Sequence, residues 1–191
     1  MSDHSFVLVL SNDLSENSTK ISRQLCLALK KLGFAATCRD TRLIRWAAVE
    51  VEKEGPARRE TYEAAVVAKW NAFISDYGID TIISLDLHWL FSSQLFVDND
   101  RVKRIHSFWL DDVRSHVQGD FRFPLEPHTL LELINKPKVS HHCCYQAQAE
   151  ELRLLGVERI FPPVMETPAE FLRAGGSEED FWNQMLTRAL E

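Results

Sequence analysis

The sequence of 191 residues predicts one α/β domain. We expect a Rossmann-like, doubly wound, mostly parallel sheet of about six strands with helices on both faces. Two observations predict this fold. Short apolar runs alternate along the chain with longer segments whose apolar residues recur at helical spacing. Glycine ends several of the helical segments just before the next apolar run, as at Gly33, Gly78 and Gly156. Such alternation places parallel strands side by side, joined by helices that cross over the sheet.

The expected strands are short apolar runs bounded by turn residues. They are residues 6–10, 35–38, 79–85, 104–110, 139–145 and 157–164. The first run, Phe-Val-Leu-Val-Leu, has no polar position and is typical of a parallel strand that is buried on both faces.

The expected helices have one apolar face and end at a breaker. They are residues 19–32, 59–77, 128–134, 146–155, 168–174 and 178–190. Pro137 stops the third, and Ser177 is a suitable N-cap for the last, whose Phe181, Met185 and Leu186 should face inward. Residues 41–57 fit either a short helix or a strand. We assign residues 1–166 to the Rossmann-like domain and residues 167–191 to a helical appendage of the same domain.

Composition restricts the class of protein. The net charge is −6 and the hydrophobic fraction is 45%, which fit an ordinary globular protein and argue against a general nucleic-acid binder. Cys26, Cys38, Cys143 and Cys144 form no CxxC pair, so reduced thiols and a cytoplasmic location are expected. Residues 1–5 lack the basic segment of a secretory signal. No apolar stretch approaches the ~18 residues of a membrane span.

The first candidate site segment follows the first strand. Ser11, Asn12 and Asp13 lie where a Rossmann fold has its phosphate-binding turn, but the segment has no glycine. Without glycine the backbone does not approach a pyrophosphate closely, which argues against a conventional dinucleotide site. These side chains could hydrogen-bond a ligand or serve as a turn and helix cap. Asp40 follows the second strand at the same edge.

The third strand leads into Asp86, His88 and Trp89. A carboxylate beside an imidazole could provide a general base and its orienting partner, and the histidine could also bind a sugar or phosphate oxygen. The alternative is a loop histidine whose hydrogen bonds are satisfied locally, beside a tryptophan that packs. Both alternatives are compatible with the sequence.

The fourth strand ends in Trp109 and the pair Asp111 and Asp112. Carboxylates at a strand end suit a divalent cation, a ribose diol or a sugar hydroxyl. Adjacent side chains in an extended segment point oppositely, so only one should face a ligand. One of the aspartates could instead cap the next helix or turn.

The fifth strand contains His141, His142, Cys143 and Cys144. In a strand, His141 and Cys143 share one face and His142 and Cys144 share the other, which is a poor arrangement for a metal. A nucleophilic cysteine paired with histidine is one possibility, and a buried strand with locally satisfied polar groups is the other. The sequence contains neither a GxSxG elbow nor a Walker A motif.

Several segments resemble the N-terminal half of GT-B glycosyltransferases, and more narrowly the spore-maturation (CgeB-like) group. They are Asp-Thr-Ile-Ile-Ser-Leu-Asp at 80–86, Ile-His-Ser-Phe-Trp-Leu-Asp-Asp at 105–112, and the helix-glycine-strand-proline sequence over 148–164. The resemblance covers roughly half of the chain and rests on the order and spacing of short patterns.

This resemblance implies a glycosyltransferase-like, acceptor-side domain that binds a sugar- or nucleotide-bearing ligand. In such enzymes the nucleotide-sugar donor binds to a second half, so the chain is expected to need a second domain or a partner for catalysis, if it is active. Position at the strand ends makes Asp13, His88 and Asp111 the candidate catalytic residues. The candidate ligand-binding residues are Ser11, Asn12, Asp40, Asp86, Trp89, Trp109, Asp112, His141 and His142. We expect no cofactor, no metal and no nucleic-acid partner.

Two other classes remain open. A non-catalytic interaction module would dimerise or dock through Phe181, Trp182, Met185 and Leu186 of the last helix and through the aromatic loop at 121–124. A small hydrolase or metal-dependent enzyme would use a site such as Asp86, His88, Asp112 and His142.

Overall fold

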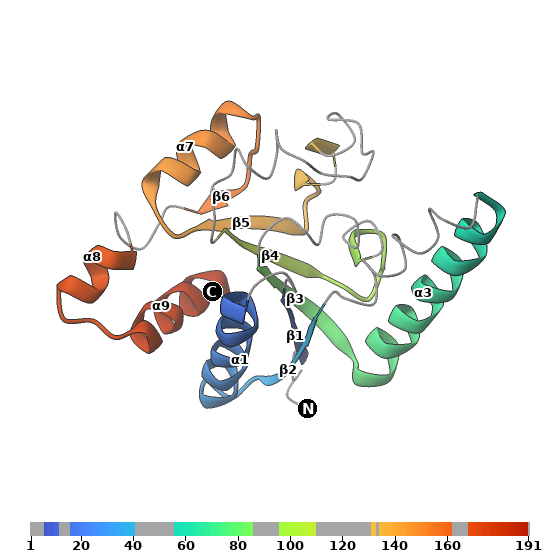
Figure 1. The fold of residues 1–191 in the computed structure, drawn as a ribbon, viewed down its shortest axis with the longest axis horizontal. Coiled ribbons are helices and arrows are strands. Elements are labelled where there is room, and N and C mark those ends of the chain that lie inside the picture. Colours follow the sequence, from blue (N-terminus) through green and yellow to red (C-terminus); the bar gives the residue numbers. More distant parts are fainter. Residues whose placement is uncertain are drawn as a thin grey trace.

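A computed structural model describes residues 6–11, 16–40, 56–85, 96–109, 131–132, 134–161 and 168–190. At its centre is a six-stranded sheet in the order β2-β1-β3-β4-β5-β6 (Figure 1). The strands are β1 (Phe6–Ser11), β2 (Ala35–Asp40), β3 (Ile79–Leu85), β4 (Arg104–Trp109), β5 (Val139–Cys143) and β6 (Ile160–Phe161). Every neighbouring pair is parallel. The predicted Rossmann-like α/β fold is therefore confirmed.

Helices cover both faces of the sheet. They are α1 (Glu16–Lys31), α3 (Pro56–Tyr77), α7 (Gln146–Leu154), α8 (Pro168–Arg173) and α9 (Glu178–Leu190). The helices α1 and α9 pack on one face, called here the α1 face, and α3 and α7 pack on the other, called the α3 face (Figure 1). In the part of the chain that the structure describes, no helix is long and apolar enough to cross a membrane.

The side chains of β1 show why the strands are continuously apolar. Leu8 and Leu10 point into the core under the α3 face, whereas Val7 and Val9 point into the core under the α1 face. All four are at most 1% exposed. Because successive side chains of a strand point to opposite faces, a strand covered on both sides needs an apolar residue at every position.

Element boundaries differ from the predicted ones at a few ends. The helix α3 begins at Pro56 rather than at residue 59, since proline is favoured in the first turn, where its missing N–H has no helical partner. The strand β5 ends at Cys143 because the Gln148 side chain accepts the backbone N–H of Cys144 (2.8 Å) and starts α7. The strand β6 is only two residues long and pairs with β5 alone. Residues 41–55 and 121–124 lie outside the described residues.

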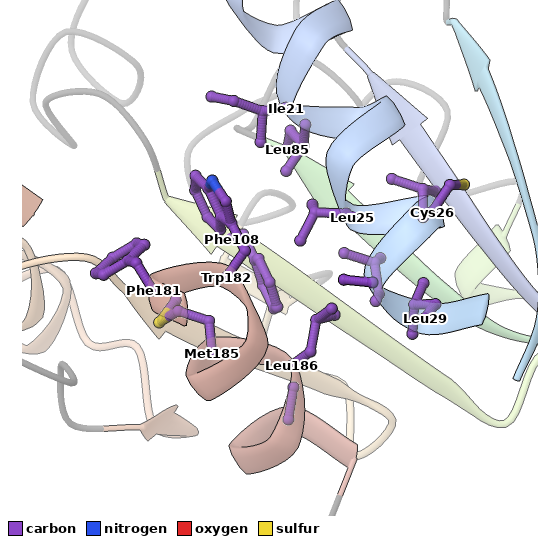
Figure 2. Close-up of a cluster of buried hydrophobic side chains, with 14 of the residues drawn as sticks. Ile21, Leu25, Cys26, Leu29, Leu85, Phe108, Phe181, Trp182, Met185 and Leu186 are labelled. Atoms are coloured by element: carbon purple, nitrogen blue, oxygen red, sulfur yellow. The ribbon is translucent and has the colours of Figure 1, made fainter. Parts of the chain in front are cut away.

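The last helix is part of the core. Phe181, Trp182, Met185 and Leu186 pack with the α1 residues Leu25 and Leu29 and with Phe108 of the sheet (Figure 2). The predicted N-cap is confirmed, because Ser177 Oγ accepts the Asp180 N–H and the Asp180 carboxylate accepts the Ser177 N–H, each at 3.1 Å.

Two ion pairs, Lys20–Glu178 and Lys31–Glu179, also join α1 to the start of α9. They are exposed and contribute little beside the buried apolar contacts.

Candidate functional site

The strand order creates a topological switch point between β1 and β3. From β1 the chain passes to β2 on one side and then returns to β3 on the other side of β1. In open α/β sheets such a reversal leaves a crevice at the carboxyl ends of the two strands, and ligands bind there. Leu10 is in register with Ser84, so β1 and β3 end at the same level, at Ser11 and Leu85.

The candidate residues fall into three groups: residues at strand ends, residues outside the described part of the chain, and the two histidines within β5. Ser11, Asp40 and Trp109 are the last residues of β1, β2 and β4, so the structure places them at the carboxyl edge of the sheet. Seven further candidates are outside the described residues, and each follows a described strand in the sequence. They are Asn12, Asp13, Asp86, His88, Trp89, Asp111 and Asp112.

The side chains of His141 and Trp109 form a hydrogen bond inside the core. The Trp109 indole N–H donates to His141 Nδ1 (3.2 Å), and His141 Nε2 lies 2.9 Å from the Ile134 carbonyl oxygen. Since Nδ1 accepts, the proton must be on Nε2, which donates to that carbonyl. Both side chains are fully buried, and burial lowers the pKa of His141 to about 4. A ligand at the edge could bind His141 only by breaking one of these bonds.

His142 belongs to a second buried polar group, on the α1 face. His142 Nε2 lies 3.1 Å from His106 Nδ1, and Ser140 Oγ lies 3.0 Å from the His106 nitrogen and 3.3 Å from the His142 nitrogen. Burial lowers the pKa of His106 to about 4, with Arg104 and Arg159 adding to the effect. Burial, followed by the neighbouring imidazoles, lowers the pKa of His142 to about 2. Both rings are therefore neutral near pH 7, and one shared proton links the facing nitrogens.

Sequence reasoning did not single out His106 as a functional candidate. Its position in the run Arg-Ile-His-Ser-Phe-Trp was a signal, because a histidine inside an otherwise apolar buried strand needs a polar partner. That partner comes from the register of β4 with β5, which sets His106 beside Ser140. Among the residues that the structure describes, none is a hydrogen-bond partner of His106 Nε2.

The alternation predicted for β5 is confirmed. Cys143 lies in the core under the α3 face, and Cys144 lies in the core under the α1 face. The two adjacent thiols therefore point in opposite directions. Among the described residues, no group of three or more histidine, cysteine, aspartate or glutamate side chains is placed to hold a metal ion.

A small cavity of about 90 Å³ lies between α1 and α9. It is lined by Gln24, Leu27, Ala28, Lys31, Glu179 and Trp182. None of these residues was predicted to form the site, and none belongs to β1 or β3. The cavity is therefore separate from the switch point.

The fold defines the class of protein: a Rossmann-like α/β domain with a topological switch point between β1 and β3. Comparisons with protein-family models, with curated proteins and with solved structures found no match. Function must therefore be inferred from the topology and from the residues that follow the strand ends.

Proposed function

We propose that this chain is a glycosyltransferase-like domain that binds a sugar- or nucleotide-bearing ligand at the carboxyl ends of β1 and β3. The single observation that carries the proposal is the topological switch point between these strands. Two polar segments selected from the sequence, residues 11–13 and 86–89, follow the two strands that flank it. That both strands at the switch point are followed in the sequence by polar segments favours a ligand there.

The residue types in these segments suit a polyhydroxylated ligand. Ser11 and Asn12 offer hydroxyl and amide groups that can exchange hydrogen bonds with sugar hydroxyls, and Trp89 offers an aromatic face. Asp13 and His88 are the candidates for a general base. Transfer itself would need a second domain or a partner chain, because an acceptor-side domain supplies only part of the contacts that stabilise the transition state.

The test is a binding experiment with matched variants. Thermal shift and calorimetry would be measured with nucleotide sugars, nucleoside diphosphates and simple glycans. A ligand at 100 times its dissociation constant should add about 2.7 kcal/mol of stability. Asp13→Asn and His88→Ala should weaken binding at least tenfold, whereas Asp76→Asn, an exposed change near the opposite, amino-terminal end of β3, should leave it unchanged.

Two results would contradict the proposal. One is the absence of binding by every ligand in the three classes. The other is binding that Asp76→Asn weakens as much as the two edge variants do, because the ligand would then not lie at the carboxyl edge.

The alternative function, an interaction module that dimerises or docks through its C-terminal helix, requires the apolar face of α9 to be open. Phe181, Trp182 and Met185 are instead at most 5% exposed and pack in the chain's own core. Trp182→Glu should therefore unfold the chain, because it buries an unpaired carboxylate. Circular dichroism and light scattering would check this. A variant that stays folded but has a lower molar mass in solution than the wild type would favour the interaction module instead.

A further inference from the structure

Two cysteines from different elements meet in the core under the α1 face. Cys26 is on α1, is 6% exposed and packs with Val7, Val9 and Ala36. Cys38 is on β2, the strand at one edge of the sheet, and is half-buried against the same cluster. Figure 2 shows the Cys26 sulfur pointing away from the axis of α1 toward the blue strands.

The strand register explains why Cys38 faces α1. Cys38 is opposite Val9, whose side chain points into the core under the α1 face. Ala36, two residues earlier in β2, also lies in that core. Because side chains two apart in a strand share a face, the Cys38 thiol is directed to the side that α1 covers.

The pKa of Cys26 agrees with this placement of the two thiols. Burial, followed by the charge and hydrogen bonding of the Cys38 thiol, raises the pKa of Cys26 to about 12. Cys26 is therefore a protonated thiol at neutral pH. Cys38 is the more accessible of the two and is the one that a soluble reagent would meet first.

We propose that Cys26 and Cys38 form a reversible disulfide that ties α1 to the edge strand β2. The oxidant is a low-molecular-weight disulfide such as glutathione disulfide. The Cys38 thiol loses its proton, and the thiolate attacks one sulfur of glutathione disulfide. One glutathione thiolate leaves and a mixed disulfide remains on Cys38.

The second step closes the bond. Cys26 loses its proton and attacks the Cys38 sulfur, which releases the second glutathione as a thiolate that takes up a proton. In total two protein thiols are oxidised to one disulfide, and one glutathione disulfide is reduced to two thiols. A negative charge on Cys38 opposes ionisation of Cys26. In the mixed disulfide Cys38 carries no charge, so this opposition is removed.

The chain between the two cysteines turns back at Gly33, so that a disulfide can join α1 to β2. The helix α1 ends at Lys31, and Gly33 turns the chain into β2 with a φ of 90°, a value that glycine adopts without strain. A disulfide would close this helix-turn-strand unit and restrict the unfolded chain. The oxidised protein should therefore melt roughly 5–10 °C higher than the reduced protein.

The test uses the full chain equilibrated in glutathione buffers of defined ratio, followed by alkylation under denaturing conditions and peptide mapping. The expected result is a Cys26–Cys38 crosslinked peptide that dithiothreitol reverses, together with the higher melting temperature. Cys143 and Cys144 are internal controls, because both are buried and point to opposite faces. They should remain free thiols throughout.

Two variants separate the two steps. Cys26→Ala should stop at the glutathione adduct on Cys38, and Cys38→Ala should leave Cys26 unmodified. The proposal is overturned if wild-type Cys38 accumulates the glutathione adduct without closing, if both thiols stay free in the oxidised buffer, or if either cysteine pairs with Cys143 or Cys144. These outcomes concern the wild-type chain, so they remain informative even if a variant does not fold.

Discussion

Two adjacent histidines of β5 are buried on opposite faces of the sheet and differ in how completely their surroundings satisfy their hydrogen bonds. On the α3 face, His141 has a donor for one ring nitrogen and an acceptor for the other, from Trp109 and Ile134. On the α1 face, the His142 ring is hydrogen-bonded to the His106 ring, and His106 Nε2 has no hydrogen-bond partner among the described residues. The difference teaches that burial alone does not decide the role of a polar side chain. His141 behaves as a fully bonded core residue, and the His106–His142 pair is polar but incompletely satisfied.

Acid should have the largest effect, because it charges the histidines on both faces. Burial lowers the pKa of His106 and His141 to about 4 and that of His142 to about 2, against 6.5 in the unfolded chain. The unfolded state therefore binds more protons below pH 6.5, so stability is fully present above that pH and is lost as the pH falls. His106 and His141 should each cost about 3 kcal/mol by pH 4.

Urea unfolding between pH 7.5 and 4 would measure this loss. A free energy of unfolding that is flat from pH 6.5 to 5 would contradict it, since three buried neutral histidines require a slope there. The two faces can then be separated by variants. His141→Phe should remove one part of the slope, and His142→Phe should remove another.

At neutral pH the same two variants should differ in stability. His141→Phe removes the acceptor of the Trp109 N–H and the donor to the Ile134 carbonyl, which should cost about 2–4 kcal/mol. His142→Phe keeps a ring stacked on Phe161 and leaves His106 bonded to Ser140, so the loss should be about 1 kcal/mol. Denaturant titration of both variants at pH 7.5 is the measurement. Equal losses, or a larger loss for His142→Phe, would mean that the two faces are not distinguished by their hydrogen bonds.

The strands and the faces of their side chains could be predicted from the sequence, because both depend on residues that are close together along the chain. The strand β3 was predicted with its observed bounds, 79–85, because an apolar run follows the helix-ending Gly78. The separation of His141 from His142 followed from the alternation of a strand. The common edge at which β1, β2, β3 and β4 end followed from parallel strands.

The side-chain hydrogen bonds between neighbouring strands could not be predicted in this way. The pairing of His106 with His142 depends on which strand lies beside β4 and in which register, and that is set by packing across the whole sheet. The bond from Trp109 to His141 likewise joins residues far apart in sequence. The Cys26–Cys38 contact needs α1 to lie over β2, which composition and spacing do not specify.

The smallest expected effect belongs to Ser140, the hydroxyl between the two imidazoles. Its Oγ lies 3.0 Å from His106 Nδ1, but the same nitrogen is already 3.1 Å from His142 Nε2. Ser140→Ala therefore removes a hydrogen bond without leaving that nitrogen unpaired, and should cost less than about 1 kcal/mol. Urea unfolding at pH 7.5 would measure it. A loss above about 2 kcal/mol would mean that the hydroxyl, rather than the shared proton, holds the two rings together, and the contrast with the fully bonded His141 would then be weaker.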